Sequence, residues 1–429
     1  HAGRADIVVV GGGPGGSTIA ALLAERGWRV VLLEKDRHPR FHIGESLLPL
    51  NLPLFERLGV KDQIERVSMA KFGVEFVSPY HGRTVTYDFA NAWDKSLPYS
   101  YQVRRSEFDH ILLKNAVAKG AEVIEDCRVT EVEFPSDAPV TVTALGADGQ
   151  DYCWQADFLV DASGRDTLLA GRLGLKSRNR RHNSAAVYGH FADARRLPGK
   201  AEGNISIFWF DHGWFWFIPL ADGATSIGAV CRSEFIKSRR GDLDSFFLSA
   251  IALCPALAER LRDARLVSPV TATGNYSYSA ARMTGRRFVM VGDAFAFVDP
   301  VFSTGVYLAM TSAFLGAEAV DVCLRKPHKA ARALRHYEAE ARRGLDAFTW
   351  FIYRIPRPAF RHLFMSPRNY FRIEEAVLSL LAGDVYGRSP IGARLVLFKL
   401  LYYVTSLFHL ISGVKTWRMR RRNAHETAH

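Results

Sequence analysis

The 429-residue chain has few cysteines, and none of them form a pair at the spacing of a metal or redox motif. They lie at Cys127, Cys153, Cys231, Cys254 and Cys323. Their odd number and wide separation encode neither a disulfide framework nor a zinc site. We therefore expect a reducing, cytoplasmic setting and no bound metal.

Other signals are also missing. The chain begins at His1 rather than methionine, and no signal peptide, internal repeat or low-complexity segment is recognisable. The net charge of +12 favours acidic partners. No nucleic-acid-binding module accompanies it, however, and the densest basic run, residues 418–422, lies in the tail. We expect no nucleic-acid partner.

The composition is that of a globular protein. Apolar residues make up 48% of the chain and charged residues 23%, which is enough to build a large core. The length suggests two or three domains.

A glycine-rich loop near the N-terminus carries the strongest motif. Residues 6–10 and 30–33 read as buried strands and residues 17–25 as a helix, which together form a βαβ unit. Gly11 permits a tight turn, Gly13 lets the backbone approach a pyrophosphate, and Gly16 allows close helix packing. This context predicts a dinucleotide site.

A carboxylate follows at the distance that such a site requires. Glu34 lies eighteen residues beyond Gly16, at the end of the second strand, where it can accept hydrogen bonds from ribose hydroxyl groups. A second segment, residues 288–294, is again a strand that ends in a turn, and Asp293 can bond the polyol chain of a flavin there.

Two further segments separate these motifs. Residues 103–109 should open a helix that runs to about Lys119, in which Arg105 either meets the flavin or pairs with Asp109. Residues 161–165 end a strand and turn at Gly164.

The segment that follows Asp293 leads into a third predicted helix. This helix should begin near Gly305 and run to about Cys323. The backbone amides of Thr304 and Gly305 at its start form a natural anion cradle.

Aromatic residues alternate along residues 214–219. On a strand, Trp214 and Trp216 share one face, while Phe215 and Phe217 share the other. A doubly buried strand would explain this pattern equally well.

Alternating segments at residues 122–124, 141–143 and 206–210 suggest a separate mixed sheet above the substrate space. From the glycine-rich loop and the second nucleotide segment, we assign residues 5–75, 100–185 and 270–330 to a discontinuous dinucleotide-binding domain, which the resemblance described below makes an FAD-binding domain. Residues 76–99 and 186–269 form the sheet-containing substrate domain, and residues 331–429 form a helical C-terminal region.

The C-terminal region is unusually aromatic. Residues 395–414 are apolar enough to span a membrane by length, although Lys399 and His409 interrupt the run. A buried or docked helix is the expectation that we favour. A weak contact with a membrane surface is the alternative.

Together these motifs give the chain a resemblance to the flavin-dependent halogenases. The resemblance rests on residues 8–16 and 292–294, on the Trp-x-Trp-x-Ile-Pro pattern of residues 214–219, and on residues 44–49 followed by Lys71. It implies an α/β fold with a Rossmann-like FAD-binding domain of the p-hydroxybenzoate hydroxylase (PHBH/GR2) type. The residues at 379–386 resemble the phenol and pyrrole branch of the family.

The resemblance also implies roles for individual residues. FAD would be bound by Gly11, Gly13, Pro14, Gly16, Glu34, Lys35, Arg105, Asp293 and Gly305. Halide would be held at Thr304 and Gly305, and Trp214 and Trp216 would separate flavin from substrate. Lys71 would receive hypohalous acid, either as a neutral nucleophile or as an ammonium that polarises it.

A partner flavin reductase would supply the reduced FAD. The implied substrate is an electron-rich phenol or pyrrole, either free or attached to an acyl or peptidyl carrier protein, and not free tryptophan. A flavin hydroxylase or a prenyl reductase of the same fold would explain the nucleotide motifs equally well, but neither predicts Lys71 together with the paired tryptophans. A non-catalytic flavoprotein is a further alternative, which would retain FAD and form no halide-dependent product.

Overall fold

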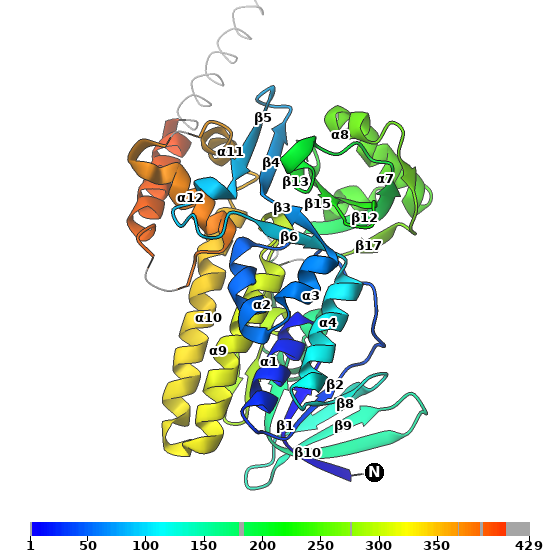
Figure 1. Ribbon diagram of the computed structural model, residues 1–429, viewed down its shortest axis with the longest axis vertical. Coiled ribbons are helices and arrows are strands. Elements are labelled where there is room, and N and C mark those ends of the chain that lie inside the picture. Colours follow the sequence, from blue (N-terminus) through cyan, green and yellow to red (C-terminus); the bar gives the residue numbers. More distant parts are fainter. Residues whose placement is uncertain (1, 180–183, 275–276, 368, 387–388, 409–429) are drawn as a thin grey trace, which may run out of the picture.

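The computed structural model describes residues 2–179, 184–274, 277–367, 369–386 and 389–408 (Figure 1). Two large sheets lie one above the other, and helices pack along their sides. The lower sheet carries the glycine-rich loop, and the upper one carries the paired tryptophans.

The lower sheet is mostly parallel. Its order is β19 (Thr284–Gly285), β20 (Phe288–Met290), β10 (Asp151–Asp161), β1 (Ala2–Val10), β2 (Val30–Leu33) and β7 (Glu122–Ile124). Every residue of β2 is buried, as expected for a strand covered on both faces. Helix α1 (Pro14–Glu25) packs between α4 (Arg105–Ala118) and α9 (Gly305–Arg325) along this sheet (Figure 1).

Two of the three segments that we assigned to a separate sheet belong here instead. Residues 122–124 are β7, which pairs with β2 in parallel. Residues 141–143 lie in β9 (Val140–Leu145), which pairs antiparallel with β8 (Arg128–Glu133) and β10. Alternation marks a strand but not its partner, because pairing is decided by contacts that are distant in sequence.

The upper sheet contains the third segment. Its order is β16 (Arg265–Leu266), β12 (Ser184–Ala192), β15 (Thr225–Arg232), β14 (Gly213–Pro219), β13 (Ile205–Phe210), β4 (Gly73–Ser78) and β5 (Arg83–Asp88), and β17 (Thr271–Thr273) also pairs with β12. We predicted that the sheet-containing domain begins at residue 76 and ends at residue 269. The upper sheet instead begins at Gly73 and extends to Thr273.

Shorter elements complete the two layers. The pair β3 (Ser68–Lys71) and β6 (Ser100–Val103) forms its own small sheet, as do β11 (Lys176–Arg178), β18 (Tyr278–Ala280) and β21 (Ala296–Phe297). The short helices are α2 (Leu52–Leu58), α3 (Lys61–Arg66), α5 (Leu168–Arg172), α6 (Ser233–Lys237), α7 (Leu243–Ala252) and α8 (Pro255–Arg260).

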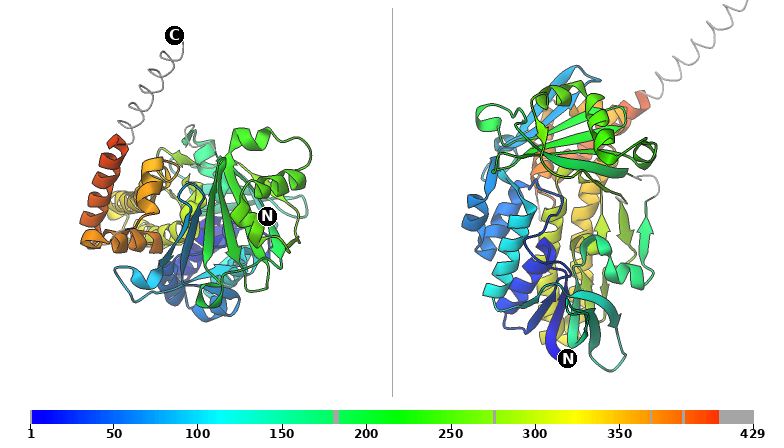
Figure 2. Two further views of the ribbon diagram at one scale, coloured as in Figure 1. Left: turned by 90° about the horizontal axis from the view of Figure 1, so that it is seen from above. Right: turned by 90° about the vertical axis from the view of Figure 1, so that its right-hand side faces the viewer.

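The C-terminal region is helical. Helix α10 (Ala330–Ile352) packs along α9, and α11 (Pro358–Phe364), α12 (Ile373–Ala382) and a helix over residues 392–408 gather beside the upper sheet (Figures 1 and 2). Residues 409–414 of the predicted apolar segment lie outside the described residues.

Within the described part of the chain, α9 is the one helix that reaches the length and hydropathy of a membrane span. Its most apolar window is 56% buried inside the protein. It serves as a core helix of the lower layer.

Candidate active site

A cavity of about 630 Å³ lies between the two layers. The glycine-rich loop, the turn after β10 and the start of α9 line it from the lower layer, and Trp214 and Trp216 line it from the upper one. The carboxyl ends of parallel strands meet at such a crevice, which is where open α/β sheets bind ligands.

The three loop glycines differ in what surrounds them. Gly11 has φ +100°, in the left-handed region, and a Cβ on Gly16 would collide with the Gly11 carbonyl. A Cβ on Gly13 would have a single neighbour within 4 Å, Arg40 Nη2 at 3.8 Å. Gly13 therefore faces open space at the N-terminus of α1, where Pro14 starts the helix.

Glu34 is buried beside this loop. Its Oε2 accepts a hydrogen bond from the Gly12 amide at 2.5 Å, and its Oε1 accepts one from Asp36 at 2.9 Å. The neighbouring Lys35 pairs with Asp166 at 2.5 Å on the cavity rim. Glu34 thus fixes the loop and also lines the cavity.

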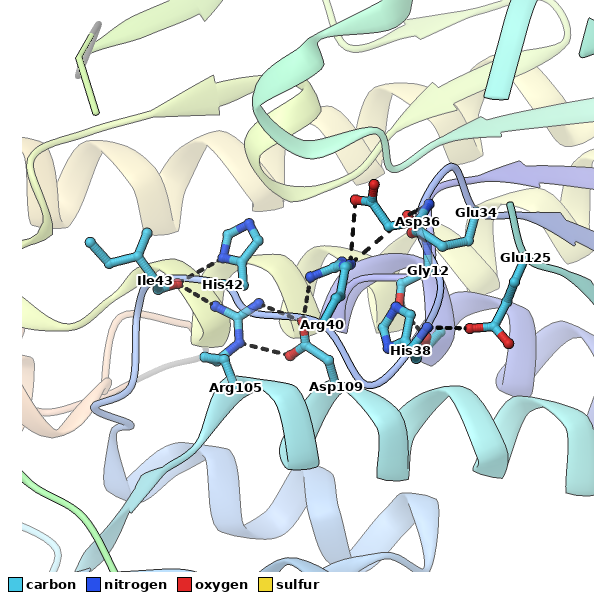
Figure 3. Close-up of polar contacts among 11 residues, drawn as sticks. Gly12, Glu34, Asp36, His38, Arg40, His42, Ile43, Arg105, Asp109 and Glu125 are labelled. Atoms are coloured by element: carbon cyan, nitrogen blue, oxygen red, sulfur yellow. Dashed lines mark hydrogen bonds and ion pairs between the residues drawn. The ribbon is translucent and has the colours of Figure 1, made fainter. Parts of the chain in front are cut away.

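Arg105 is occupied by protein groups. It donates from Nε and Nη2 to Asp109 at 2.7 and 2.9 Å, and from Nη1 to the Ile43 carbonyl at 2.7 Å (Figure 3). Burial opposes ionisation of Asp109, but the Arg105 charge and hydrogen bonds lower the pKa of Asp109 below its ordinary value. Of the two interpretations of Arg105, the structure shows the ion pair.

The arginine nearest to the glycine loop is Arg40, which we did not predict. Its Nη1 lies 3.4 Å from Asp109 Oδ2 (Figure 3). Its Nη2 lies 3.8 Å from the position that a Cβ on Gly13 would occupy. Nothing in the local sequence marks Arg40, because it lies in an irregular segment. Its placement depends on Asp109, 69 residues further along.

At the other side of the cavity, Asp293 lies in the turn that follows β20. Its carbonyl accepts a hydrogen bond from the Tyr278 hydroxyl at 2.8 Å. Burial raises the pKa of Asp293 to about 6, although Arg165 and Arg105 oppose this shift. The side chain is thus a polar group at the cavity wall.

The cavity suits a dinucleotide cofactor such as FAD. The open space at Gly13, the helix N-terminus behind it and the arginine beside it match a pyrophosphate. Across the described residues, no group of three or more His, Cys, Asp or Glu side chains gathers in a metal-binding arrangement.

The paired tryptophans lie on one face of β14, as predicted. Their ring centroids are 6.1 Å apart, and Trp216 donates to Ser226 Oγ at 3.1 Å. Phe215 and Phe217 pack into the other core, beneath α7 and α8. Opposite Trp216, Gly228 leaves room for the indole, since a Cβ there would overlap the ring.

Trp214 is also tied to the segment that leads to α9. It hydrogen-bonds to the Asp299 carboxylate, which in turn accepts from the Val301 amide at 3.2 Å. Burial raises the pKa of Asp299 to about 6. Trp214 and the start of α9 therefore form one connected wall.

Helix α9 begins at Gly305, with Thr304 at its N-cap. Both residues line the large cavity, and a Cβ on Gly305 would meet nothing within 4 Å. The free amides at this helix start form an electropositive site open to the cavity.

Lys71 is fully buried at the end of β3. Its Nζ donates to Ser46 Oγ at 2.9 Å and to the Leu47 carbonyl at 3.0 Å, and it lies 5.4 Å from the Phe89 ring centroid. Burial lowers the pKa of Lys71 to about 7. The amine is therefore substantially neutral near physiological pH.

Lys71 faces a second, much smaller cavity of about 10 Å³. This cavity is lined by Leu48, Lys71, Val74, Phe76, Ile205, Val301, Phe302, Ser303 and Leu381. Ile205 and Ser303 line both cavities, so the lysine chamber adjoins the large one directly.

A buried pair that the sequence did not reveal lies between the two layers. His190 Nε2 is 3.1 Å from both carboxylate oxygens of Glu45, and Glu45 lines the large cavity. The two residues are 145 positions apart, and a lone histidine on a strand carries no recognisable signal. The pair fixes the segment that also carries Ser46.

The fold and this site define a flavin-dependent oxidoreductase in which a buried lysine with a lowered pKa lies apart from the nucleotide groove. The sequence profile of the tryptophan halogenase family matches residues 6–93 and 81–355. The chain belongs to this family of flavin-dependent halogenases.

Individual relatives support the same family assignment. The 1H-pyrrole-2-carbonyl-[peptidyl-carrier protein] chlorinase of Pseudomonas fluorescens is 32% identical, with 89% of each chain covered. The tryptophan 2-halogenase of Chondromyces crocatus is 35% identical over 77% of this chain and 64% of its own length. Among solved structures, the myxobacterial chondrochloren halogenase, an FAD-dependent halogenase, superposes with a TM-score of 0.79 at 35% identity, covering 91% of this chain and 92% of the other.

The chain is thus an FAD-dependent halogenase that uses FAD and a halide ion and needs a separate flavin reductase. The family match decides against the hydroxylase, the prenyl reductase and the non-catalytic flavoprotein.

Proposed function

We propose that this enzyme halogenates an electron-rich phenol or pyrrole, carried on the phosphopantetheine arm of a carrier protein, at Lys71. The observation that carries the proposal is the position of Lys71. The amine is buried in its own chamber, and that chamber adjoins the nucleotide groove without being part of it. A relative that is 32% identical acts on a pyrrole bound to a carrier protein.

In this proposal FAD lies along the large cavity. Its contacts would come from Gly11, Gly13, Pro14, Gly16, Glu34, Lys35, Asp293 and Gly305. Arg40 would take the phosphate role that the sequence suggested for Arg105, because Arg40 Nη2 lies beside Gly13, whereas the Arg105 guanidinium is directed at Asp109 and the Ile43 carbonyl. When bound in its reduced form, FAD with oxygen supplies the oxidising power that converts halide to hypohalous acid.

Thr304 and Gly305 would hold the halide. The free amides at the start of α9 carry partial positive charge, and the open space at Gly305 leaves room for an anion. Asp299 fixes this segment to Trp214, so the halide site and the tryptophan wall keep one geometry.

At Lys71, the neutral amine would attack the halogen of hypohalous acid. The N–X bond forms as the X–O bond breaks, and the hydroxide that leaves takes the amine proton to give water. The aromatic ring then takes X⁺ from nitrogen and gives its own proton back to the amine. A pKa near 7 favours this role over that of a permanent ammonium.

Trp214 and Trp216 would keep the aromatic substrate away from the flavin. A ring that cannot reach the groove escapes direct hydroxylation, and exclusion of water protects the oxidant. Each indole is at least nine-tenths buried and lines the large cavity, as this barrier requires.

The decisive experiment is mass spectrometry of products. Phenols and pyrroles, each offered free and loaded on a carrier protein, are incubated with the enzyme, a flavin reductase, oxygen, and chloride or bromide. We expect halogenated product from the loaded rings. Efficient turnover of free tryptophan would contradict the substrate class, and equal turnover of free and loaded rings would contradict the carrier.

All five cysteines are free. We therefore propose a reducing, cytoplasmic location.

A further inference from the structure

The helix over residues 392–408 has two apolar faces. Its inner face packs on the C-terminal helices, with Phe398 stacked on Phe351 at 5.5 Å and Tyr402 edge-on to Trp350 at 5.4 Å. Its outer apolar side chains recur every three or four residues and are 41–65% exposed. They are Val396, Leu400, Leu401, Tyr403, Val404, Leu407 and Phe408. We call these seven side chains the outer stripe.

A continuous exposed stripe of this kind marks an interaction surface. Scattered apolar side chains need no explanation, but a periodic stripe along one helix face does. The helix lies on the outside of the molecule, next to α12 (Figures 1 and 2).

Cations border the stripe. Lys399 and Arg394 lie on either side of it at helical spacing, and Arg354 donates to the hydroxyl of Tyr403 at 3.2 Å. Lys399 and Arg354 both contact the Trp350 ring, and burial, together with the charge of Arg354, lowers the pKa of Lys399. Across the described part of the chain, none of these three cations forms an ion pair with a carboxylate.

The surrounding sequence is also positively charged. Between Asp384 and Glu426 there is no acidic residue, whereas eight lysines and arginines occur. A second copy of this chain would bring like charges together, so self-association along this helix is disfavoured. The pattern is complementary to a partner that is acidic and has an apolar contact surface.

The stripe is also linked to the lysine chamber. Phe398 contacts Phe360 at 5.7 Å, Phe360 stacks on Phe364 at 5.6 Å, and Phe364 contacts Phe76 at 4.7 Å. Phe76 lines the cavity that Lys71 faces, and Leu381 of α12 lines it too. A partner docked on the stripe would thus be a few ring contacts from the reacting amine.

We infer that the outer stripe, with Lys399, Arg394 and Arg354, is the docking surface for the acidic carrier protein that presents the substrate. This inference rests on the proposed function. Carrier proteins are small and acidic, and their long flexible arm suits a buried amine that lies behind a layer of aromatic side chains. Docking here would place the arm's attachment point beside α12 and the lysine chamber.

The test uses charge inserted into the stripe. Leu400→Glu and Val404→Glu each place a carboxylate at a position that is more than half exposed, so folding is retained. Leu248→Glu is the matched control, because Leu248 is 50% exposed on α7, which lies across the upper layer from α12 and the C-terminal helices (Figure 1). The substrates are a pyrrole-2-carbonyl or hydroxybenzoyl group on a peptidyl carrier protein, and the same group on free pantetheine.

We expect the stripe variants to raise KM for the loaded carrier about tenfold or more, and to leave turnover of the pantetheine substrate within about twofold. The control should behave as the wild type. Added salt should weaken the wild-type reaction with the carrier and not the reaction with pantetheine. Wild-type kinetics for the stripe variants on the loaded carrier would overturn the inference.

The same variants distinguish the carrier protein from two other partners of the outer stripe, a lipid surface and a second copy of the chain. If the wild type binds phosphatidylglycerol vesicles and Leu400→Glu abolishes this binding without changing carrier kinetics, the stripe is a lipid-binding surface and the inference is wrong. If the wild type is a dimer that Leu400→Glu converts to a monomer without changing carrier kinetics, the stripe is a dimer interface and the inference is wrong. Failure of the proposed function looks different, because neither the loaded nor the pantetheine substrate would then be halogenated.

Discussion

The amine of Lys71 is held 2.9 Å from the hydroxyl of Ser46. Burial lowers the pKa of this amine, and no carboxylate contributes to the shift. A lysine kept this way gains two hydrogen bonds, and among the described residues no carboxylate forms an ion pair with it. Its burial therefore costs stability and lowers the pKa of the amine, a combination that is common at functional sites.

Replacement of Lys71 by methionine should abolish halogenation while reduced FAD is still oxidised by oxygen. In the proposed mechanism the lysine acts after the oxidant has formed, so only transfer to the aromatic ring should fail. Product mass spectrometry and oxygen consumption measure the two steps separately. Loss of both activities would instead mean damage to the flavin groove.

The same variant should be more stable than the wild type near neutral pH. Burial lowers the pKa of Lys71 from 10.5 to about 7, so the unfolded chain binds the extra proton between these values and wild-type stability rises with pH across this window. After allowing for the two lost hydrogen bonds, Lys71→Met should gain about 2 kcal/mol at pH 7. Chemical unfolding at pH 7 and pH 9.5 should show this gain shrinking.

Halogen transfer should accelerate as the pH rises through about 7. The neutral amine is the proposed nucleophile, and its fraction grows above the pKa of Lys71. Single-turnover transfer from added hypohalous acid isolates this step from flavin chemistry. A rate that falls through the same range, compared at equal concentrations of undissociated hypohalous acid, would assign the ammonium form to the reaction.

Gly13→Val should weaken FAD binding at least tenfold. The new side chain would enter the space beside Arg40 Nη2, where the pyrophosphate is expected. Gly171→Val is the control, since a Cβ at Gly171 meets nothing within 4 Å and the residue lies on α5, away from the cavity lining. Titration followed by flavin fluorescence compares the two.

Arg40→Met should also reduce FAD affinity, by about tenfold, because a charge-assisted contact with phosphate contributes 1.5–3 kcal/mol in general. Arg262→Met, at an exposed position just after α8, should have no effect. If the Arg40 variant bound FAD like the wild type, the phosphate contact would have to be sought elsewhere.

Gly228→Ala should lower the melting temperature, because its Cβ would overlap the Trp216 ring. A cost of about 1–3 kcal/mol is typical of such overpacking. Gly392→Ala, where a Cβ meets open space, should leave stability nearly unchanged. Unfolding scans of the two variants check this pair.

Local patterns predicted much of this molecule. The βαβ unit, the start of α9 at Gly305 and the shared face of Trp214 and Trp216 follow from spacing alone, because turns and strand alternation are local.

Features that join distant parts of the chain could not be predicted in this way. The partner strands of residues 122–124 and 141–143, the contact of Arg40 with Asp109 and the pair of Glu45 with His190 all depend on tertiary packing. The burial of Lys71 has the same cause, since a lysine at a strand end is ordinarily solvated.

The lysine chamber holds about 10 Å³, room for roughly one small molecule the size of water. An aromatic ring is far larger, so it gains access only when side chains such as Leu381 and Phe302 give way. In the proposed mechanism, the resting enzyme would therefore separate oxidant from substrate by size, because a species of about the size of water fits beside Lys71 and a ring does not. Arrival of the substrate, rather than formation of the oxidant, would then set the moment at which the carbon–halogen bond is made.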